Sequence, residues 1–160
     1  MVQYICANDG TRHQPDDPIA MLTAEHRQVR ALFQQYADTP DPYLRQIIAE
    51  HVFAELALHT LLEETVFYPA VAEQVDTEGK ELVKEALQDH QEIKALLETL
   101  QEIDDDTAFE TRFQALHAQV EQHIEDEEAR MFPEAAQVLA SHWEEITVLL
   151  LERKARILAS

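Results

Sequence analysis

One set of residues occurs twice in this chain at the same internal spacing. In each copy two histidines lie 33 positions apart, a glutamate follows the second histidine by four positions, and a proline follows it by ten. The second copy lies 64 positions after the first; the two sets are His26, His59, Glu63 and Pro69, then His90, His123, Glu127 and Pro133. Histidine and glutamate are both metal-ligand types. We interpret the repeat as a duplicated half-site that closes on itself around a pair of metal ions.

The residues around these positions also align without a gap. HRQVRALF, from His26, matches HQEIKALL, from His90, in polar and apolar class at every position. HTLLEETVFYP, from His59, matches HIEDEEARMFP, from His123, at its acidic and proline positions. Any two amphipathic helical hairpins share an apolar pattern. That pattern does not explain why histidine, glutamate and proline fall in register, so the metal interpretation is favoured over simple core packing.

Composition favours helices joined by short loops. Only two glycines and six prolines occur in 160 residues, and Ala, Leu, Glu and Gln dominate. No segment alternates convincingly between polar and apolar residues, so no sheet is expected. Loop signals divide the chain into predicted helices over about residues 19–37, 42–75, 80–103, 107–139 and from 141 onward.

These helices predict an all-α fold. Two hairpins of equal length give an up-down-up-down four-helix bundle with an internal two-hairpin repeat, plus a short C-terminal fifth helix. The expected organisation is an N-terminal arm over 1–17, the bundle over 18–140 and the C-terminal helix over 141–160. The second and fourth helices are expected to bend at Pro69 and Pro133.

Two sequence signals predict how the last two helices begin. Thr107 with Glu110, and Ser141 with Glu144, each have the spacing of a capping box. The C-terminal helix carries an apolar stripe that must be covered. The sequence leaves open whether this stripe packs on the bundle of a monomer or forms the contact of a homodimer.

Charge and cysteine content exclude several classes of function. The net charge of -20 disfavours binding to nucleic acid or to an anionic membrane surface. The single cysteine, Cys6, excludes an internal disulfide and a four-thiolate iron–sulfur cluster within one chain, and its own role is left open. No segment is apolar enough to span a bilayer, and the first residues do not resemble a secretory signal. We therefore expect a cytoplasmic protein.

The spacing between histidine and glutamate suits one face of a helix. Four residues advance an α-helix by about 400°, which is about 40° past a full turn, so both side chains can reach one ion. Four imidazoles and two carboxylates without a thiolate suit iron, copper, zinc, nickel or manganese rather than calcium. If both carboxylates bridge two six-coordinate ions, at least one position on each ion stays open for a small ligand.

The pattern His…His-x-x-x-Glu…His…His-x-x-x-Glu resembles the hemerythrin-like (HHE cation-binding) domain over about residues 19–140. This resemblance implies a non-haem centre of two iron ions with a bridging oxo or hydroxo group. It also implies that the partner is dioxygen, another small diatomic molecule or peroxide. The iron ligands implied by the resemblance are His26, His59, Glu63, His90, His123 and Glu127.

The chain departs from the oxygen-carrying members of that family. They have a fifth histidine four residues after the first histidine of the second half, where this chain has Lys94. The lost histidine disfavours simple oxygen carriage and favours redox chemistry with peroxide, dioxygen or nitric oxide. The alternative is a non-catalytic carrier, store or sensor of oxygen, iron or nitric oxide. The sequence leaves open whether Glu127 or Glu128 is the ligand, and whether His51 supplies a fifth imidazole.

Overall fold

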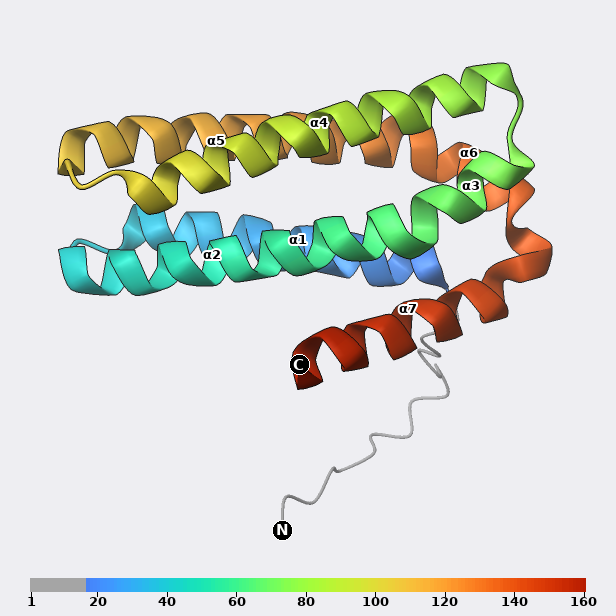
Figure 1. The fold of residues 1–160 in the computed structure, drawn as a ribbon, viewed down its shortest axis with the longest axis horizontal. Helices are drawn as coiled ribbons and strands as arrows, with labels where there is room; N and C mark the ends of the chain where they lie inside the picture. The colour runs from blue at the N-terminus through green and yellow to red at the C-terminus, as the bar shows by residue number, and fades with distance from the viewer. Residues whose placement is uncertain (1–16) are drawn as a thin grey trace, which may run out of the picture.

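Two antiparallel helical hairpins lie against each other in the computed structural model, which describes residues 17–160 (Figure 1). The first hairpin contains α1 (Pro18–Asp38), α2 (Pro42–Leu62), the π-helical turn η1 (Glu63–Phe67) and α3 (Tyr68–Gln74). The second contains α4 (Thr77–Glu102), α5 (Asp106–Asp126), the π-helical turn η2 (Glu127–Met131) and α6 (Phe132–Val138). A 3₁₀ turn, η3 (Ala140–His142), leads into α7 (Trp143–Ala159). The predicted all-α bundle with a two-hairpin repeat and an added C-terminal helix is confirmed.

The long helices pack as the repeat predicts. Helix α1 lies against α2, and α4 lies against α5. Helix α7 runs beneath the first hairpin and contacts α1, α2 and η1 (Figure 1). None of the helices in the described part of the chain has the length and apolar character needed to cross a bilayer. The predicted arm lies outside the described residues, except for Asp17.

Aspartates, rather than the predicted capping boxes, begin the bundle helices. The carboxylate of Asp105 accepts a 2.7 Å hydrogen bond from the backbone N–H of Ala108, so α5 begins before Thr107. A charged carboxylate is a stronger acceptor than a hydroxyl, and Glu110 instead accepts from the Tyr36 hydroxyl at 2.7 Å. The second capping box is also wrong, because Ser141 lies inside the η3 turn, where it cannot act as the N-cap of α7.

Each predicted proline bend takes the form of a π turn. Proline has no N–H and its ring crowds the carbonyl four residues back, so a regular α-helix cannot continue unchanged. The N–H of the residue before each proline bonds five residues back, from Tyr68 to Glu63 and from Phe132 to Glu127. Such π turns are frequent at functional sites. Here each one begins at a glutamate of the repeat.

The buried interior has two apolar clusters with the repeated histidines between them. In α1, α2 and α4 the histidine falls between residues of one cluster and residues of the other; in α1, for example, His26 lies between Leu22 and Val29. In the second hairpin His123 lies between Val120 of one cluster and Met131 of η2, which belongs to the other. The cluster near the kinked ends includes Phe67, Phe132 and residues of α7. A layer of buried polar side chains therefore crosses the middle of the bundle.

Gly79 → Ala should destabilise the fold. A methyl group at position 79 would overlap the Cβ of Val75 and lie 2.6 Å from Glu134 Oε1. Overpacking typically costs ~1–3 kcal/mol, which exceeds the gain of ~0.5–1 kcal/mol from replacing a helical glycine. Urea unfolding should show a loss of about 1 kcal/mol or more, whereas the exposed neighbouring change Glu78→Ala should have little effect. Equal stability of Gly79→Ala and the wild type would show that α3 and α4 separate freely at this point.

Candidate metal centre

All six side chains predicted as ligands meet in the middle of the bundle. They are contributed by four helices and two π turns, and all are buried: His26, His59, Glu63, His90, His123 and Glu127. His90 and Glu63 have no exposed surface. Burial of unpaired polar groups at this scale is costly unless another group satisfies them. The cluster therefore has the character of a binding site rather than of a packed core.

The first half of the cluster joins the first hairpin to one residue of the second. The Nε2 atoms of His26 and His59 lie 3.1 Å apart. Glu63 Oε1 lies 2.8 Å from His59 Nε2, and Glu127 Oε1 lies 3.2 Å from His26 Nε2. These four donor atoms all lie within 4.8 Å of one another, which is close enough for one ion to contact all of them.

The second half repeats this arrangement with the other oxygens of the same glutamates. The Nε2 atoms of His90 and His123 are again 3.1 Å apart. Glu63 Oε2 lies 3.0 Å from His90 Nε2, and Glu127 Oε2 lies 3.6 Å from His123 Nε2. Each glutamate thus presents one oxygen to each histidine pair, as a carboxylate that bridges two ions would.

The contact between paired imidazoles fits a metal ion. In three of the four histidines Nδ1 lies within hydrogen-bond distance of a carboxylate, which can only accept, so the hydrogen is on Nδ1 and the Nε2 lone pair points inward. Two donors bound at right angles about 2.1 Å from one ion are about 3 Å apart. In addition, Glu63 Oε1 and Glu127 Oε1 are buried without a hydrogen-bond partner among the described residues.

The repeat extends to a second layer of carboxylates around the histidines. Glu25 and Asp89, which precede the first histidine of each half, face the second histidine of the same half. Glu64 and Glu128 face the first histidine of the opposite half. The Nδ1-to-oxygen distances are 2.8 Å for His59–Glu25, 3.3 Å for His123–Asp89, 3.0 Å for His90–Glu64 and 3.7 Å for His26–Glu128.

The contacts of these two adjacent glutamates show that Glu127 faces the inside of the cluster and that Glu128 belongs to the second layer. Both oxygens of Glu127 face the inner Nε2 atoms of the cluster. Glu128 instead faces the outer nitrogen of His26 and pairs with Arg30 at 3.5 Å. Glu128 is therefore placed to orient a histidine, and Glu127 is placed among the candidate ligand atoms.

Basic side chains hold several of these outer carboxylates. Lys94 Nζ lies 2.7 Å from both oxygens of Glu64, so the residue at the carriers' extra histidine position points away from the cluster. Lys154 of α7 lies 2.9 Å from Glu25 Oε2. Asp89 is the second-half equivalent of Glu25, and in the described residues it pairs with His123 but with no lysine or arginine. The two halves therefore differ in the charge that surrounds their histidines.

Tyr68 is a site residue that the sequence analysis missed. Its hydroxyl oxygen lies 2.7 Å from Glu63 Oε2, 3.2 Å from His90 Nε2 and 3.5 Å from His123 Nε2. The hydroxyl also hydrogen-bonds to Glu127 Oε2. Its equivalent in the repeat, Phe132, stacks on His26 with ring centroids 5.6 Å apart. The aligned strings FYP and MFP contain the signal, because they differ by one hydroxyl group.

The π turn explains how Tyr68 reaches the cluster. Residues five apart in an α-helix point about 140° away from each other. The bond from the Tyr68 N–H to the Glu63 carbonyl widens the helix over these residues and brings both side chains toward the same side. The proline that follows thus contributes indirectly to the site.

Without metal, the histidines and glutamates share protons. Burial opposes charge on His59, but the negative charge of Glu63, the hydrogen bond to Glu25 and the close contact with Glu63 raise its pKa well above its ordinary value. Burial likewise opposes charge on His123, yet the hydrogen bond to Glu63 and the charges of Glu127 and Glu63 raise its pKa to about 9. In the metal-free chain, protons thus balance the negative charge of the two glutamates.

The pKa values of the two central glutamates shift in opposite directions. Burial and the charge of Glu63 raise the pKa of Glu127. The pKa of Glu63 is held well below its ordinary value, because the charge of His59 and the polar contacts with His123, His26 and His59 outweigh burial. Burial and the charges of both carboxylates raise the pKa of Tyr68 well above its ordinary value, so its hydroxyl stays neutral when no metal is bound.

The remaining described histidines lie outside the cluster. The side chain of His51 is 57% exposed and pairs with Glu55 at 3.8 Å, so it supplies no fifth imidazole. His117 stacks on Phe33, with ring centroids 4.3 Å apart. His142 lies on the surface beside α7.

Comparisons with known proteins agree with this geometry. The family described as hemerythrin HHE cation binding domain matches residues 17–135. No curated protein matches this chain. Among solved structures, the chain is similar to a hemerythrin HHE cation-binding domain-containing protein from Mycobacterium kansasii, with a TM-score of 0.74 and 19% identity. That match covers 88% of this chain and 86% of the other, and at this identity it supports the fold alone.

The stability of the metal-free chain should fall as pH rises from about 6.5 to 9. Protonated His123 has a pKa of about 9 when folded, above its ordinary value of 6.5. Its contribution is therefore complete below pH 6.5 and is lost as pH rises through 9, a decrease of up to about 3 kcal/mol. Urea unfolding across this range measures it. His51→Gln, at an exposed site, should keep the same pH dependence, and a flat profile in the wild type would contradict the proton sharing.

Proposed function

The chain belongs to the hemerythrin HHE cation-binding domain family, and from this premise we propose that it holds two iron ions and reacts there with peroxide, dioxygen or nitric oxide. One observation carries the proposal: Glu63 presents one oxygen to each histidine pair, 2.8 Å from His59 and 3.0 Å from His90. Glu127 does the same from the other hairpin. A shared pair of carboxylates suits two ions more than one.

The donor atoms fit iron. Imidazole and carboxylate donors without thiolate suit iron among several first-row metals. His26 and His59 would hold one ion, His90 and His123 the other, and Glu63 with Glu127 would bridge them. The outer carboxylates fix the orientation of the imidazoles and increase their basicity, which strengthens metal binding.

Tyr68 favours redox chemistry over reversible oxygen carriage. Its hydroxyl lies among the four second-half donors, so we propose that it becomes a fifth donor to that ion. A bound cation lowers the pKa of such a group and favours its anionic form, and an anionic oxygen donor favours ferric over ferrous iron. The first-half ion, which faces Phe132 instead, would have four protein donors and more open positions.

The chain's own residues would control the reaction of the metals. Bound iron would supply the electron-transfer chemistry. The apolar clusters on both sides of the polar layer would restrict bulk water and larger molecules. The acidic composition and single cysteine support a cytoplasmic protein that binds neither nucleic acid nor membrane, as a monomer or a homodimer.

Anaerobic loading with ferrous iron tests the proposal directly. The chain should take up two iron ions, measured by elemental analysis, and the loaded protein should then consume added hydrogen peroxide over many turnovers. Nitric oxide should give an absorbance change with the loaded protein and none with the metal-free chain. Retention of one zinc ion without exchangeable iron would contradict the di-iron centre, and a stable peroxide adduct without turnover would support the carrier alternative.

Removing a bridging glutamate should lower metal content more than removing an outer one. Glu63→Ala and Glu127→Ala each delete a donor to both ions. The iron content of each variant should therefore fall well below two ions per chain. Glu128→Ala is the matched control, because it removes an adjacent carboxylate that only faces the outer side of His26. Elemental analysis after gel filtration measures this. Loss of metal in Glu128→Ala alone would reverse the assignment.

Tyr68→Phe should change the spectrum of the ferric protein while leaving its iron content near two. The substitution copies Phe132, so it removes one oxygen and preserves the aromatic packing. A phenolate bound to ferric iron absorbs visible light by charge transfer, and this band should disappear. Tyr36→Phe, which removes a hydroxyl far from the cluster, should keep the band. An unchanged spectrum in Tyr68→Phe would show that the hydroxyl is not a ligand.

A further inference from the structure

The two halves of the centre differ on their outer flanks. Positions that are equivalent in the repeat have opposite character on the two flanks. The first flank carries Met21, Leu62 and Val66, and the second carries Glu85, Asp126 and Arg130 at the equivalent positions. Leu62 and Val66 are buried, whereas Arg130 and Glu85 are more than half exposed. The sequence therefore distinguishes a closed flank from an open one.

Helix α7 closes the first flank. Its residues Ile146 and Leu150 are buried in the same apolar cluster as Leu62 and Val66. Lys154 completes the closure with its 2.9 Å contact to Glu25, the carboxylate that holds His59. The second half has no equivalent of α7 in the described chain.

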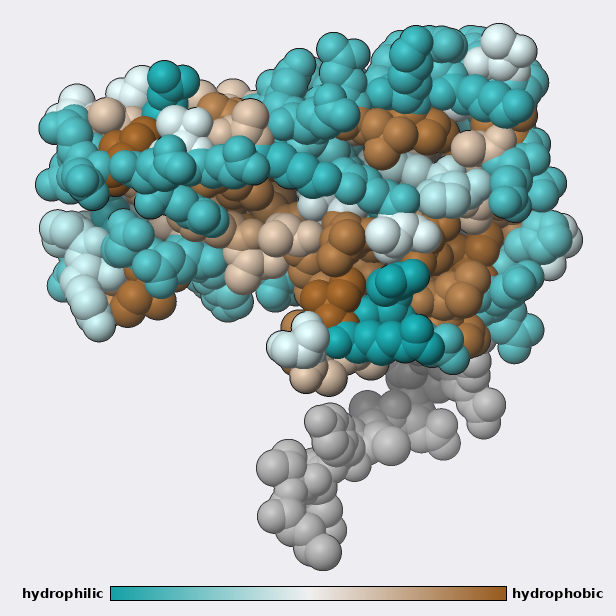
Figure 2. Space-filling view, in the orientation of Figure 1, coloured by the Kyte–Doolittle hydropathy of each residue, from teal (hydrophilic) through white to brown (hydrophobic). Residues whose placement is uncertain are grey.

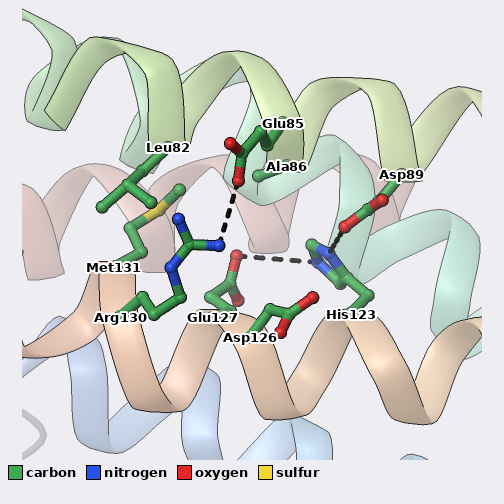
Figure 3. A pocket seen from close by; sticks show the side chains of 9 residues that line it. All are labelled: Leu82, Glu85, Ala86, Asp89, His123, Asp126, Glu127, Arg130 and Met131. Carbon is green, nitrogen blue, oxygen red and sulfur yellow. Dashed lines mark hydrogen bonds and ion pairs between the residues drawn. The ribbon is translucent and has the colours of Figure 1, made fainter. Parts of the chain in front are cut away.

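The second flank has a depression that reaches the metal centre. Figure 3 shows α4 above it and the α5–η2 segment below it, with His123 and Glu127 pointing into the space between them. Asp89 lies 3.3 Å from His123 Nδ1. At the rim, Arg130 and Glu85 form an ion pair at 3.1 Å. The depression thus joins solvent to two of the centre's own side chains.

The charges around this depression suit a cation. Three carboxylates outside the centre line it, from Glu85, Asp89 and Asp126, against the single guanidinium of Arg130. At its inner side, Glu127 is 3% exposed, and its Oε2 lies 3.6 Å from His123 Nε2. Carboxylate oxygens suit hydrated divalent cations. The net charge of -20 would also concentrate cations near the surface.

We propose that this depression is the route by which divalent metal ions enter the centre. Asp126 and Asp89 receive the cation, and the pair between Arg130 and Glu85 separates to admit it. The ion then reaches His123 and Glu127 first and the first-half ligands afterward. This inference rests on the proposed function, because it requires that the six central side chains bind metal.

Loading kinetics test the route. The metal-free full-length chain is mixed with cobalt(II), an air-stable probe whose visible absorbance reports binding to the centre. Asp126→Asn, which keeps the side chain's shape, should slow loading about tenfold at low salt, because a charged route raises association rates by 10-fold or more. Added salt should slow the wild type more than the variant. Arg130→Ala should load faster than the wild type.

A double variant based on the first flank and a control variant far from the depression complete the test. Asp126→Leu combined with Arg130→Val gives two of the three second-flank positions the residues of the first flank, and should slow loading below the wild-type rate while final cobalt content stays the same. Glu102→Gln removes one exposed charge at the far end of α4 and should load at the wild-type rate. If the double variant fails to fold, Asp126→Asn decides the question alone.

The possible outcomes distinguish a failure of the proposed entry route from a failure of the proposed metal-binding function. Wild-type loading rates in Asp126→Asn, with normal final cobalt content, would overturn the proposed route and leave the metal centre intact. Equal slowing in Glu102→Gln would also overturn it, since the effect would then belong to overall charge. Absence of cobalt binding in the wild type would instead contradict the proposed function. Slow loading confined to the flank variants supports the route.

Discussion

The opposed lone pairs of the buried histidines are the constraint on which the rest of the structure depends. His26 faces His59, and His90 faces His123, each across 3.1 Å, with two carboxylates beside them and apolar clusters on both sides. Such a layer is stable only when a proton or a cation lies between the acceptors. The outer carboxylates, their basic partners and the two π turns can each be understood as parts that hold this layer in position.

The sequence predicted the centre because a duplicated site has to repeat its ligand types. The offset between His26 and His90 sufficed to find the six central side chains, and helix periodicity sufficed to predict the bundle. Helix starts were less predictable. Thr107 and Ser141 had the right local spacing, but Asp105 and the η3 turn provided better partners for the same backbone groups. Local signals fail where a neighbouring residue competes for the same hydrogen bond.

Departures from the repeat were harder to predict than the repeat itself. Tyr68 lies in the string FYP, which aligns with MFP in the repeat, and a single sequence does not give the width of the helical turn that directs its hydroxyl inward. The role of Lys94 was also hidden, because its partner Glu64 belongs to the other hairpin. The contact of Lys154 with Glu25 spans most of the chain, so it could be found only after α7 was placed.

The cover provided by α7 makes the two hairpins of the repeat unequal as separate units. A single hairpin that pairs with an identical copy gives both sides of the assembly the same surface. Two copies of the second hairpin would carry Asp126 and Arg130 on both sides, whereas two copies of the first would leave Leu62 and Val66 uncovered twice. The polar flank of the second hairpin therefore needs no cover, and the apolar flank of the first hairpin stays out of water only because α7 packs on it.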